Sequence, residues 1–274
     1  MTIELGRYGA WRRVLEISPA MAAEIEEIGY PAIWVGGSPP GDLQAIEDIL
    51  DATERVPVVT GIVNMWREDA KTVADSYHRI AQRHPGRFLL GVGIGHPEAT
   101  REYQKPLDKI VEYLDQLDES NVPADAIVLA ALGPKVLRIS AERTAGAHPY
   151  LSTHRHTKMA REILGAGPLL APEHTVIVGG DAREAEEQAR KWVSRYLQLV
   201  NYRNNLRWEG WSDEDIDHGG SDRLLDALVL RGDAESIAAG LRQHVEAGAD
   251  HVGVQPLGDD PIPQFRELAE VLFD

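Results

Sequence analysis

The chain has 274 residues, of which 43% are hydrophobic and 26% charged, with a formal net charge of −16 and no cysteine. This balance is that of a globular protein with enough apolar residues to form a full core. The absence of cysteine excludes disulfides, thiolate zinc sites and cysteine nucleophiles. The acidic charge argues against a nucleic-acid partner, because such binding depends on basic residues that neutralise phosphates.

No run in the sequence approaches the roughly 18 apolar residues that a membrane span needs. The acidic start, Met1 to Glu4, lacks the basic residues and the apolar segment of a signal peptide. We therefore expect a cytoplasmic protein that has no membrane partner and acts on a small-molecule substrate.

Short apolar, β-branched runs alternate with longer amphipathic segments along the whole chain. In chain order, strands are predicted at residues 3–6, 32–35, 56–60, 88–92, 126–130, 146–151, 174–178 and 251–255. Helices are predicted at residues 19–28, 43–53, 70–83, 106–117, 135–142, 158–164, 182–202 and 234–247. Eight such strands close a parallel (β/α)8 TIM barrel, so we predict one α/β barrel domain over residues 1–274.

One region interrupts this alternation. Residues 204–222 are polar, contain tryptophan and are rich in glycine, and a further helical stretch follows at 223–230. We interpret the region near residues 183–230 as a helical and loop insertion in the barrel. Its composition fits a lid, a subunit contact or a plain surface loop, and the sequence leaves these three open.

In a barrel of this kind, function resides at the carboxyl ends of the strands. The predicted ends are rich in glycine, which lets the backbone approach a flat ligand closely. They also lack a carboxylate pair, a poised lysine and a Ser-His-Asp set, which is typical of a redox enzyme whose cofactor carries the chemistry. The alternative is that these glycines only make tight turns. The candidate ligand-binding residues at the ends of the second to fifth predicted strands are Gly36, Gly37, Ser38, Gly61, Ile62, Asn64, Gly93, Gly95, Ala131, Leu132 and Gly133.

The pattern Gly91-x-Gly93-x-Gly95 resembles part of a dinucleotide-binding fingerprint. That fingerprint must open a helix directly and be followed by an acidic residue at the end of the next strand. Here Pro97 and polar residues follow instead, and the acids about 20 residues later lie in a helical stretch. We reject a Rossmann fold.

Two histidines fall at predicted strand ends, His96 and His148, where a catalytic proton carrier could stand. The pair His154-x-His156 has no third ligand nearby in the sequence, so we predict no metal site. Ser152 or Thr153 is expected to cap the helix that begins at His154, whose free N–H groups would suit a phosphate.

Three segments together resemble the bacterial luciferase-like superfamily. They are residues 22–36, residues 60–62 with 85–95, and residues 130–150. The most specific is the run Gly86-Arg87 followed by Leu90-Gly91-Val92-Gly93-x-Gly95. The resemblance is greatest to probable oxidoreductases that depend on the deazaflavin coenzyme F420, and it implies a ring system lying across the strand ends.

The resemblance also implies roles for particular positions. Gly61-Ile62 matches a bulge with a non-prolyl cis peptide that backs the deazaflavin in relatives. Gly95-His96 and the backbone of residues 131–133 match segments that contact the cofactor, and the turn over Ser152, Thr153 and His156 matches one near its phosphate. Relatives are often dimers, so a homodimer is left open.

The sequence departs from the family pattern near the hydride site. Several relatives carry an acid and a histidine after the second strand, where Gly37 and Ser38 stand here. His96 replaces a carboxylate that some relatives use after the fourth strand. The substrate and the proton donor therefore cannot be transferred from the family, and His96 and His148 are our candidates for handling the proton.

We predict hydride transfer between F420 and a small organic substrate. The alternatives are an FMN-dependent luciferase-like monooxygenase and a non-catalytic flavin-binding or interaction protein. An acidic cofactor tail would need a local basic patch in this acidic chain. The residues that could contribute to one are Arg7, Arg12, Arg13, Lys135, Arg138 and Arg155.

Overall fold

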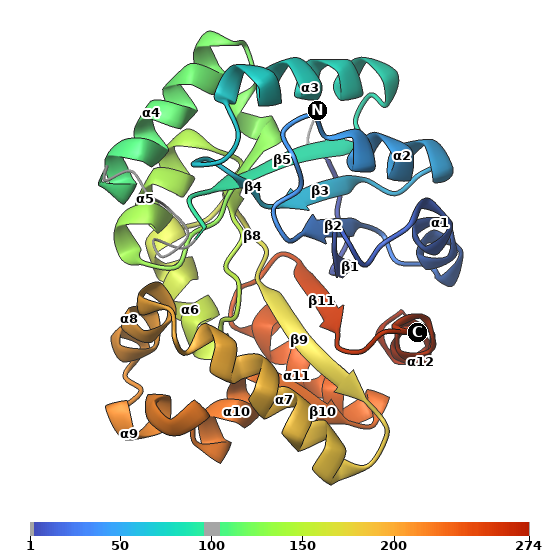
Figure 1. Ribbon diagram of the computed structural model, residues 1–274, viewed down its shortest axis with the longest axis vertical. Coiled ribbons are helices and arrows are strands. Elements are labelled where there is room, and N and C mark those ends of the chain that lie inside the picture. Colours follow the sequence, from blue (N-terminus) through green and yellow to red (C-terminus); the bar gives the residue numbers. More distant parts are fainter. Residues whose placement is uncertain (1–2, 96–104, 274) are drawn as a thin grey trace.

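The computed structural model describes residues 3–95 and 105–273 (Figure 1). The strands are β1 (Tyr8–Arg13), β2 (Ile33–Gly36), β3 (Val58–Gly61), β4 (Val63–Asn64), β5 (Phe88–Gly93), β6 (Ile127–Leu129), β7 (Gly146–Ala147), β8 (Leu169–Leu170), β9 (Glu173–Val178), β10 (Val229–Gly232) and β11 (Val252–Pro256). They pair in the order β10-β9-β11-β1-β2-β3-β5-β6-β7-β8, with β4 beside β5. Every pairing is parallel.

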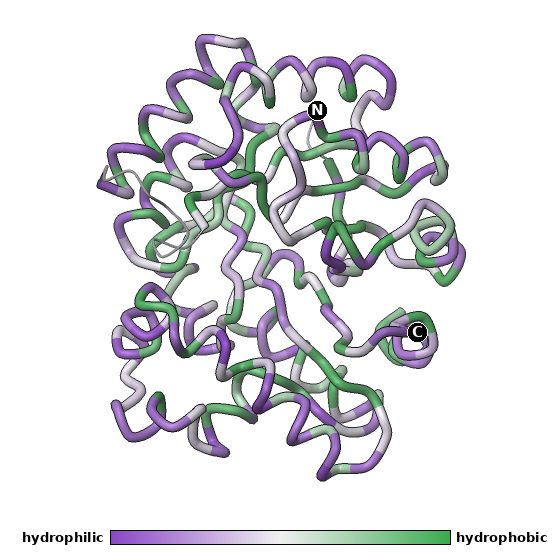
Figure 2. The backbone as a smooth tube through the Cα atoms, viewed as in Figure 1, coloured by the Kyte–Doolittle hydropathy of each residue, from purple (hydrophilic) through white to green (hydrophobic). Residues whose placement is uncertain are grey.

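Helices follow most of the strands. They are α1 (Pro19–Ile28), α2 (Gln44–Ala52), α3 (Ala70–Arg83), α4 (Pro106–Glu119), α5 (Pro134–Arg143), α6 (His154–Leu164), α7 (Ala182–Tyr196), α8 (Val200–Glu209), α9 (Asp213–Ile216), α10 (Asp222–Leu228), α11 (Ala234–Glu246) and α12 (Ile262–Leu272), with 3-10 turns η2 (Ala124–Ala126) and η3 (Asp217–Gly219). Figure 2 shows hydrophobic residues along many of the strands, and helices on which hydrophobic and hydrophilic residues alternate.

The sheet is closed by the segment that joins β8 to β9. On one side the Ala171 N–H donates to the Ala147 carbonyl, in line with β7. On the other side the Gly253 N–H, in β11, donates to the Pro172 carbonyl. Residues 169–178 thus bridge β7 and β11. The predicted parallel barrel with alternating helices is confirmed.

Large side chains fill the interior of the barrel. Trp11, Trp34, Val59, Leu89 and Val128 come from five different strands and form one buried cluster. Because side chains occupy this space, the barrel is a packed core and not a channel. Any ligand must therefore bind above it, at the loops that follow the strands.

Six of the eight predicted strands are confirmed, but the first was wrong. It was expected at residues 3–6, whereas β1 spans Tyr8–Arg13. The pair Arg12-Arg13 hid this strand, because two charged residues rarely end a buried run. Arg12 is nevertheless 3% exposed, since its guanidinium donates to the Pro256 carbonyl over 2.8 Å. The strand predicted at 146–151 is also shorter, ending at Ala147.

Other differences lie in the carboxyl-terminal half. The helix predicted over 182–202 is interrupted after Tyr196, and α8 starts at Val200. The helical stretch predicted at 223–230 gives way at Val229 to β10. Helix α12 was not predicted, since prolines at its start obscure the pattern. Proline is tolerated in a first helical turn, where no intrahelical donor is lost.

The insertion shares a hydrophobic cluster with the barrel. Helices α7, α8, α9 and α10 pack through one buried cluster that also includes Leu151, Ile177 and Val229 from the barrel side. This shared cluster fixes the insertion against the strand ends. The structure therefore resolves one open point, because the insertion is not a plain surface loop.

Candidate active site

A cavity of about 760 Å³, here called the main pocket, lies at the carboxyl ends of the strands. Its volume is within the range of sites for small molecules and cofactors. It brings together ten of the residues predicted from the strand ends and histidines: Gly37, Ser38, Gly61, Ile62, Asn64, Gly95, Ala131, Leu132, Gly133 and His148.

Five other predicted residues do not line this pocket. A Cβ on Gly36 would lie 1.9 Å from the Trp11 ring, so the ring covers that position. Gly93 faces Ala130, and Ser152, Thr153 and His156 are buried behind the wall. His96 lies outside the described residues.

Thr153 caps α6, as predicted, by accepting the His156 backbone N–H over 3.2 Å. Its hydroxyl also donates to Glu209 of α8 over 2.6 Å. The His156 ring bonds the Leu132 carbonyl through Nε2 at 2.9 Å. In this arrangement Thr153 and His156 tie the wall of the main pocket to the insertion.

Two tryptophans and two histidines form two layers at the bottom of the pocket, and only the upper pair, Trp11 and His148, lines it. The Trp11 indole N–H donates to His148 Nε2 over 3.4 Å, and His148 Nδ1 bonds the Ala171 carbonyl at 2.6 Å. The His148 ring stacks on Trp34 with centroids 4.1 Å apart. Burial lowers the pKa of His148 to about 4. His148 is therefore neutral, and its one N–H is used by Ala171.

The same pattern repeats one layer deeper. The Trp34 indole N–H donates to His251 Nε2 over 2.9 Å, and His251 Nδ1 bonds the Gly6 carbonyl at 2.8 Å. Burial also lowers the pKa of His251 to about 4. Two neutral Trp–His pairs thus make a polar but uncharged floor in which each polar atom has a partner.

Gly61 lies directly above this floor. The Gly61–Ile62 peptide bond is cis. A Cβ on Gly61 would approach Trp11 Nε1 to 3.0 Å and His148 Nε2 to 3.1 Å. A larger residue would press on the floor, so the glycine keeps the backbone low and leaves room above it.

Tyrosines that the sequence did not single out form one wall. The Tyr150 hydroxyl donates to Gln255 Oε1 over 3.0 Å, which leaves the Tyr196 hydroxyl to donate to Tyr150 over 3.0 Å. Burial raises the pKa of Tyr150 well above its ordinary value, and that of Tyr196 to about 12. Both are therefore protonated, neutral groups at physiological pH.

Residues of α8 continue this wall, since the Tyr202 ring packs against those of Tyr150 and Tyr196. Asn201, Asn204, Asn205, Tyr202 and Trp208 of α8 line the main pocket. The Asn205 amide donates to Glu209 Oε1 over 2.8 Å. The Oδ1 atoms of Asn201 and Asn205 are buried and have no hydrogen-bond partner within the described parts of the chain. These two oxygens can accept hydrogen bonds from a ligand.

Two arginines are the only charged side chains among the described residues that line the pocket. Arg13 is 42% exposed and lies 3.9 Å from Glu16, and Arg67 is exposed. Of the six basic residues considered from the sequence, only Arg13 lines this pocket. Arg67 was missed because it follows the short strand β4, which was not predicted.

Within residues 3–95 and 105–273, no three histidine or carboxylate side chains gather as a metal site. In the same residues, no helix is both long and apolar enough to cross a membrane.

A family model described as luciferase-like monooxygenase matches residues 6–251, which is most of the chain. Among solved structures, the protein is similar to an F420-dependent secondary alcohol dehydrogenase in complex with an F420–acetone adduct, at 17% identity over 98% of each chain and a TM-score of 0.77. It is also similar to the F420-dependent tetrahydromethanopterin reductase of Methanopyrus kandleri, at 13% identity over 98% of this chain and 99% of that one, with a TM-score of 0.72.

A third similar structure is the oxygenating constituent of 3,6-diketocamphane monooxygenase from Pseudomonas putida, a type II Baeyer-Villiger monooxygenase in complex with FMN. It shows 16% identity over 97% of each chain and a TM-score of 0.70. No curated protein matches the sequence. At these identities the structures establish the fold alone, whereas the family model covers most of the chain. The chain belongs to the luciferase-like monooxygenase family.

Proposed function

We propose that the protein is an oxidoreductase that transfers a hydride between coenzyme F420 and a small organic substrate. The main pocket carries this proposal. No carboxylate or lysine is among its described lining residues, and its histidine is neutral. A pocket without charged acid-base groups suits a cofactor that itself supplies the redox chemistry.

The residues present fit such a ring. The low backbone at Gly61 and the side chains of Ile62 and Ile94 offer an apolar face. The unpartnered Oδ1 of Asn205 can accept an N–H from the rim of a flavin-type ring. Arg13 and Arg67 lie at the pocket and would receive the acidic tail. When bound, the deazaflavin supplies or accepts the hydride at its central ring.

The protein itself must hold or move a proton at the substrate. His148 is poorly suited to donate one, because its N–H bonds Ala171. We assign this role to the Tyr196 hydroxyl, which lines the pocket. Its hydrogen bonds Tyr150 but can rotate about the C–O bond toward a substrate oxygen, which the ring N–H of His148 cannot do. His96 remains the candidate from the sequence for the same role.

A second candidate is an FMN-dependent monooxygenase. The family description and the likeness to an FMN complex favour it. The isoalloxazine ring has the same tricyclic outline, so the apolar face and the amide wall would suit it equally. What separates the two is which cofactor the pocket accepts.

A turnover assay tests the proposal. The protein is loaded with F420 and offered a panel of secondary alcohols, and with reduced F420 and a panel of carbonyl compounds, while the deazaflavin absorbance is followed. A parallel assay supplies FMN, a reductant and oxygen. Turnover with F420 alone supports the proposal, and turnover with FMN alone transfers the assignment to the monooxygenase. The absence of turnover in both assays favours the non-catalytic alternative.

A further inference from the structure

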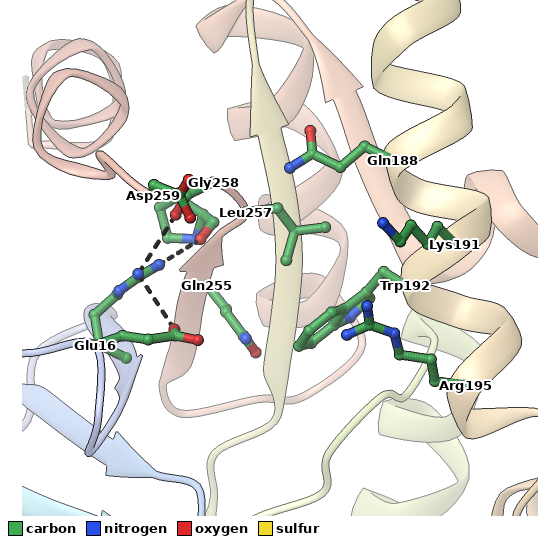
Figure 3. Close-up of a pocket in the computed structure, with 11 residues that line it drawn as sticks. Glu16, Gln188, Lys191, Trp192, Arg195, Gln255, Leu257, Gly258 and Asp259 are labelled. Carbon is green, nitrogen blue, oxygen red and sulfur yellow. Dashed lines mark hydrogen bonds and ion pairs between the residues drawn. The ribbon is translucent and has the colours of Figure 1, made fainter.

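A second cavity, of about 410 Å³, lies beside the main pocket between α7 and the ends of β1 and β11 (Figure 3). We call it the side pocket. Successive residues of a strand point to opposite faces, so Arg12 lines the side pocket whereas Trp11 and Arg13 line the main pocket. The two cavities thus lie on either side of one strand end.

Two buried hydrogen-bond donors of the side pocket have no acceptor. Arg12 is 3% exposed, and its Nε has no partner in the described residues. The buried Nε1 of Trp192 likewise has none. Unpaired buried donors cost free energy, and native proteins generally satisfy them. These two donors are therefore available to an acceptor group of a ligand.

Two cations of α7 reach the same cavity. Lys191 and Arg195 are one helical turn apart, and Figure 3 shows them extending from α7 toward Gln255 on the opposite wall. Neither has an ion pair within the described residues, although the chain carries a net charge of −16. The side pocket thus holds two cations whose charge no described carboxylate pairs with.

The two acids that line the side pocket, Glu16 and Asp259, both interact with Arg12. Glu16 lies 3.2 Å from the Arg12 guanidinium and 3.9 Å from that of Arg13. The negative charge of Asp259 also stabilises the positive charge of Arg12. Their charges are therefore offset by these arginines on the β1 side, and the α7 side stays positive.

A row of hydrogen-bonded side chains runs from one cavity to the other. Gln255 lines the side pocket and accepts the Tyr150 hydroxyl, and Tyr150 bonds Tyr196 in the main pocket. Arg195 of the side pocket and Tyr196 of the main pocket are consecutive residues of α7, so the two cavities are neighbours along this helix.

We propose that the side pocket binds a carboxylate or phosphate group, and that this group is the acidic end of the substrate. The assignment of the anion to a substrate rests on the proposed function, whereas the anion site itself does not. The substrate class is then an organic acid or phosphate ester that carries an alcohol or carbonyl group at its other end.

Anion binding is tested first, without any cofactor. Inorganic phosphate and succinate are titrated into the protein by calorimetry, with intrinsic tryptophan fluorescence as a second readout. The double variant K191Q/R195Q should bind at least tenfold more weakly. The matched control is R183Q, also on α7, whose guanidinium pairs with Glu187 and does not line the side pocket. Equal binding by wild type and K191Q/R195Q would overturn the site.

The source of the anion is tested second. F420 and a deazaflavin without the acidic tail are titrated into wild type and K191Q/R195Q. We expect the variant to bind both as well as wild type does. A loss confined to F420 would mean that the side pocket holds the cofactor tail, which overturns the substrate assignment.

The last arm measures kcat/KM with F420 for acidic substrates and their neutral analogues. We expect K191Q/R195Q to lose at least tenfold for the acids alone, and an equal loss for both would overturn the proposal. If wild type binds phosphate but no F420, the anion site holds and the proposed function fails. If wild type binds F420 but no anion, the anion site fails and the proposed function stands.

Discussion

The indole N–H of Trp11 donates to Nε2 of His148 at the floor of the main pocket, over 3.4 Å and across 137 residues of sequence. This bond fixes which nitrogen of His148 carries the proton. Because Nε2 accepts, Nδ1 must hold the hydrogen that Ala171 receives. The pair therefore shapes the floor and presents no exchangeable proton to a ligand.

From this pair we predict that His148 positions the floor and carries no proton. His148→Asn should lower turnover less than threefold and leave the pH profile unchanged, since a group with a pKa of about 4 stays neutral across the assay range. His148→Leu should lower the free energy of unfolding by about 2–4 kcal/mol, because it strands the Trp11 N–H and the Ala171 carbonyl. Kinetics and urea unfolding measure the two effects. A tenfold loss of turnover in His148→Asn would show that His148 handles a proton after all.

The second prediction concerns the tyrosine wall. Tyr196→Phe removes the hydroxyl that bonds Tyr150, so kcat should fall at least tenfold while the dissociation constant of the cofactor changes less than threefold. Tyr77→Phe, at a tyrosine outside the main pocket, is the matched control. Stopped-flow turnover and a binding titration make the comparison.

His96→Ala distinguishes the two proton carriers. If His96 is the donor, this variant should lose at least tenfold in turnover, and Tyr196→Phe should then remain close to wild type. Losses in both variants would place the two groups in one relay.

The third prediction concerns the rim. Arg67→Gln removes an exposed cation that has no ion pair within the described residues, so F420 should bind about tenfold more weakly at low salt and less so as salt screens the charge. Arg7→Gln, also exposed but outside the main pocket, should bind as wild type does. Equal affinities in the two variants would remove Arg67 from the cofactor site.

The fourth prediction is a loss of stability in mild acid. Burial lowers the pKa of His148, His156, His174 and His251 from 6.5 to about 4, and lowers that of His244 well below its usual value. Between these values the unfolded chain binds protons that the folded one does not, so stability present above pH 6.5 is lost as the pH falls toward 4.

Two buried carboxyls oppose this trend. Burial raises the pKa of Glu173 and of Glu209 from 4.5 to about 7. Their contribution to the free energy of unfolding therefore falls as the pH rises through that range. The histidines outnumber them, and each net proton is worth about 1.4 kcal/mol per pH unit. The urea midpoint should therefore drop steadily from pH 6.5 to 4.5. A midpoint that is constant over this range would contradict the neutral, buried state of these histidines.

The fold could be predicted from the sequence because its signals are local. Alternating apolar strands and amphipathic helices give the barrel, and Gly61 and Gly133 mark strand ends that do line the main pocket. The first strand was misplaced because its burial of Arg12 depends on the Pro256 carbonyl, 244 residues away. Trp11 was lost from the candidate site for the same reason.

The insertion wall could not be predicted. Asn201, Asn205 and Trp208 look like ordinary polar and aromatic positions of a helix, and only the packing of α7 and α8 on Leu151 and Ile177 brings them to the strand ends. The neutrality of His148 was hidden as well, since it follows from a partner far away in sequence. Long-range contacts, which no local pattern encodes, thus decide the chemistry of the site.

Equilibrium titration of the purified protein with F420 and, in parallel, with FMN tests the central claim most directly. We predict that F420 binds at least tenfold more tightly than FMN, and that Arg67→Gln weakens F420 binding. Preference for FMN would contradict the proposed function and favour the monooxygenase, and binding of neither ring would contradict both.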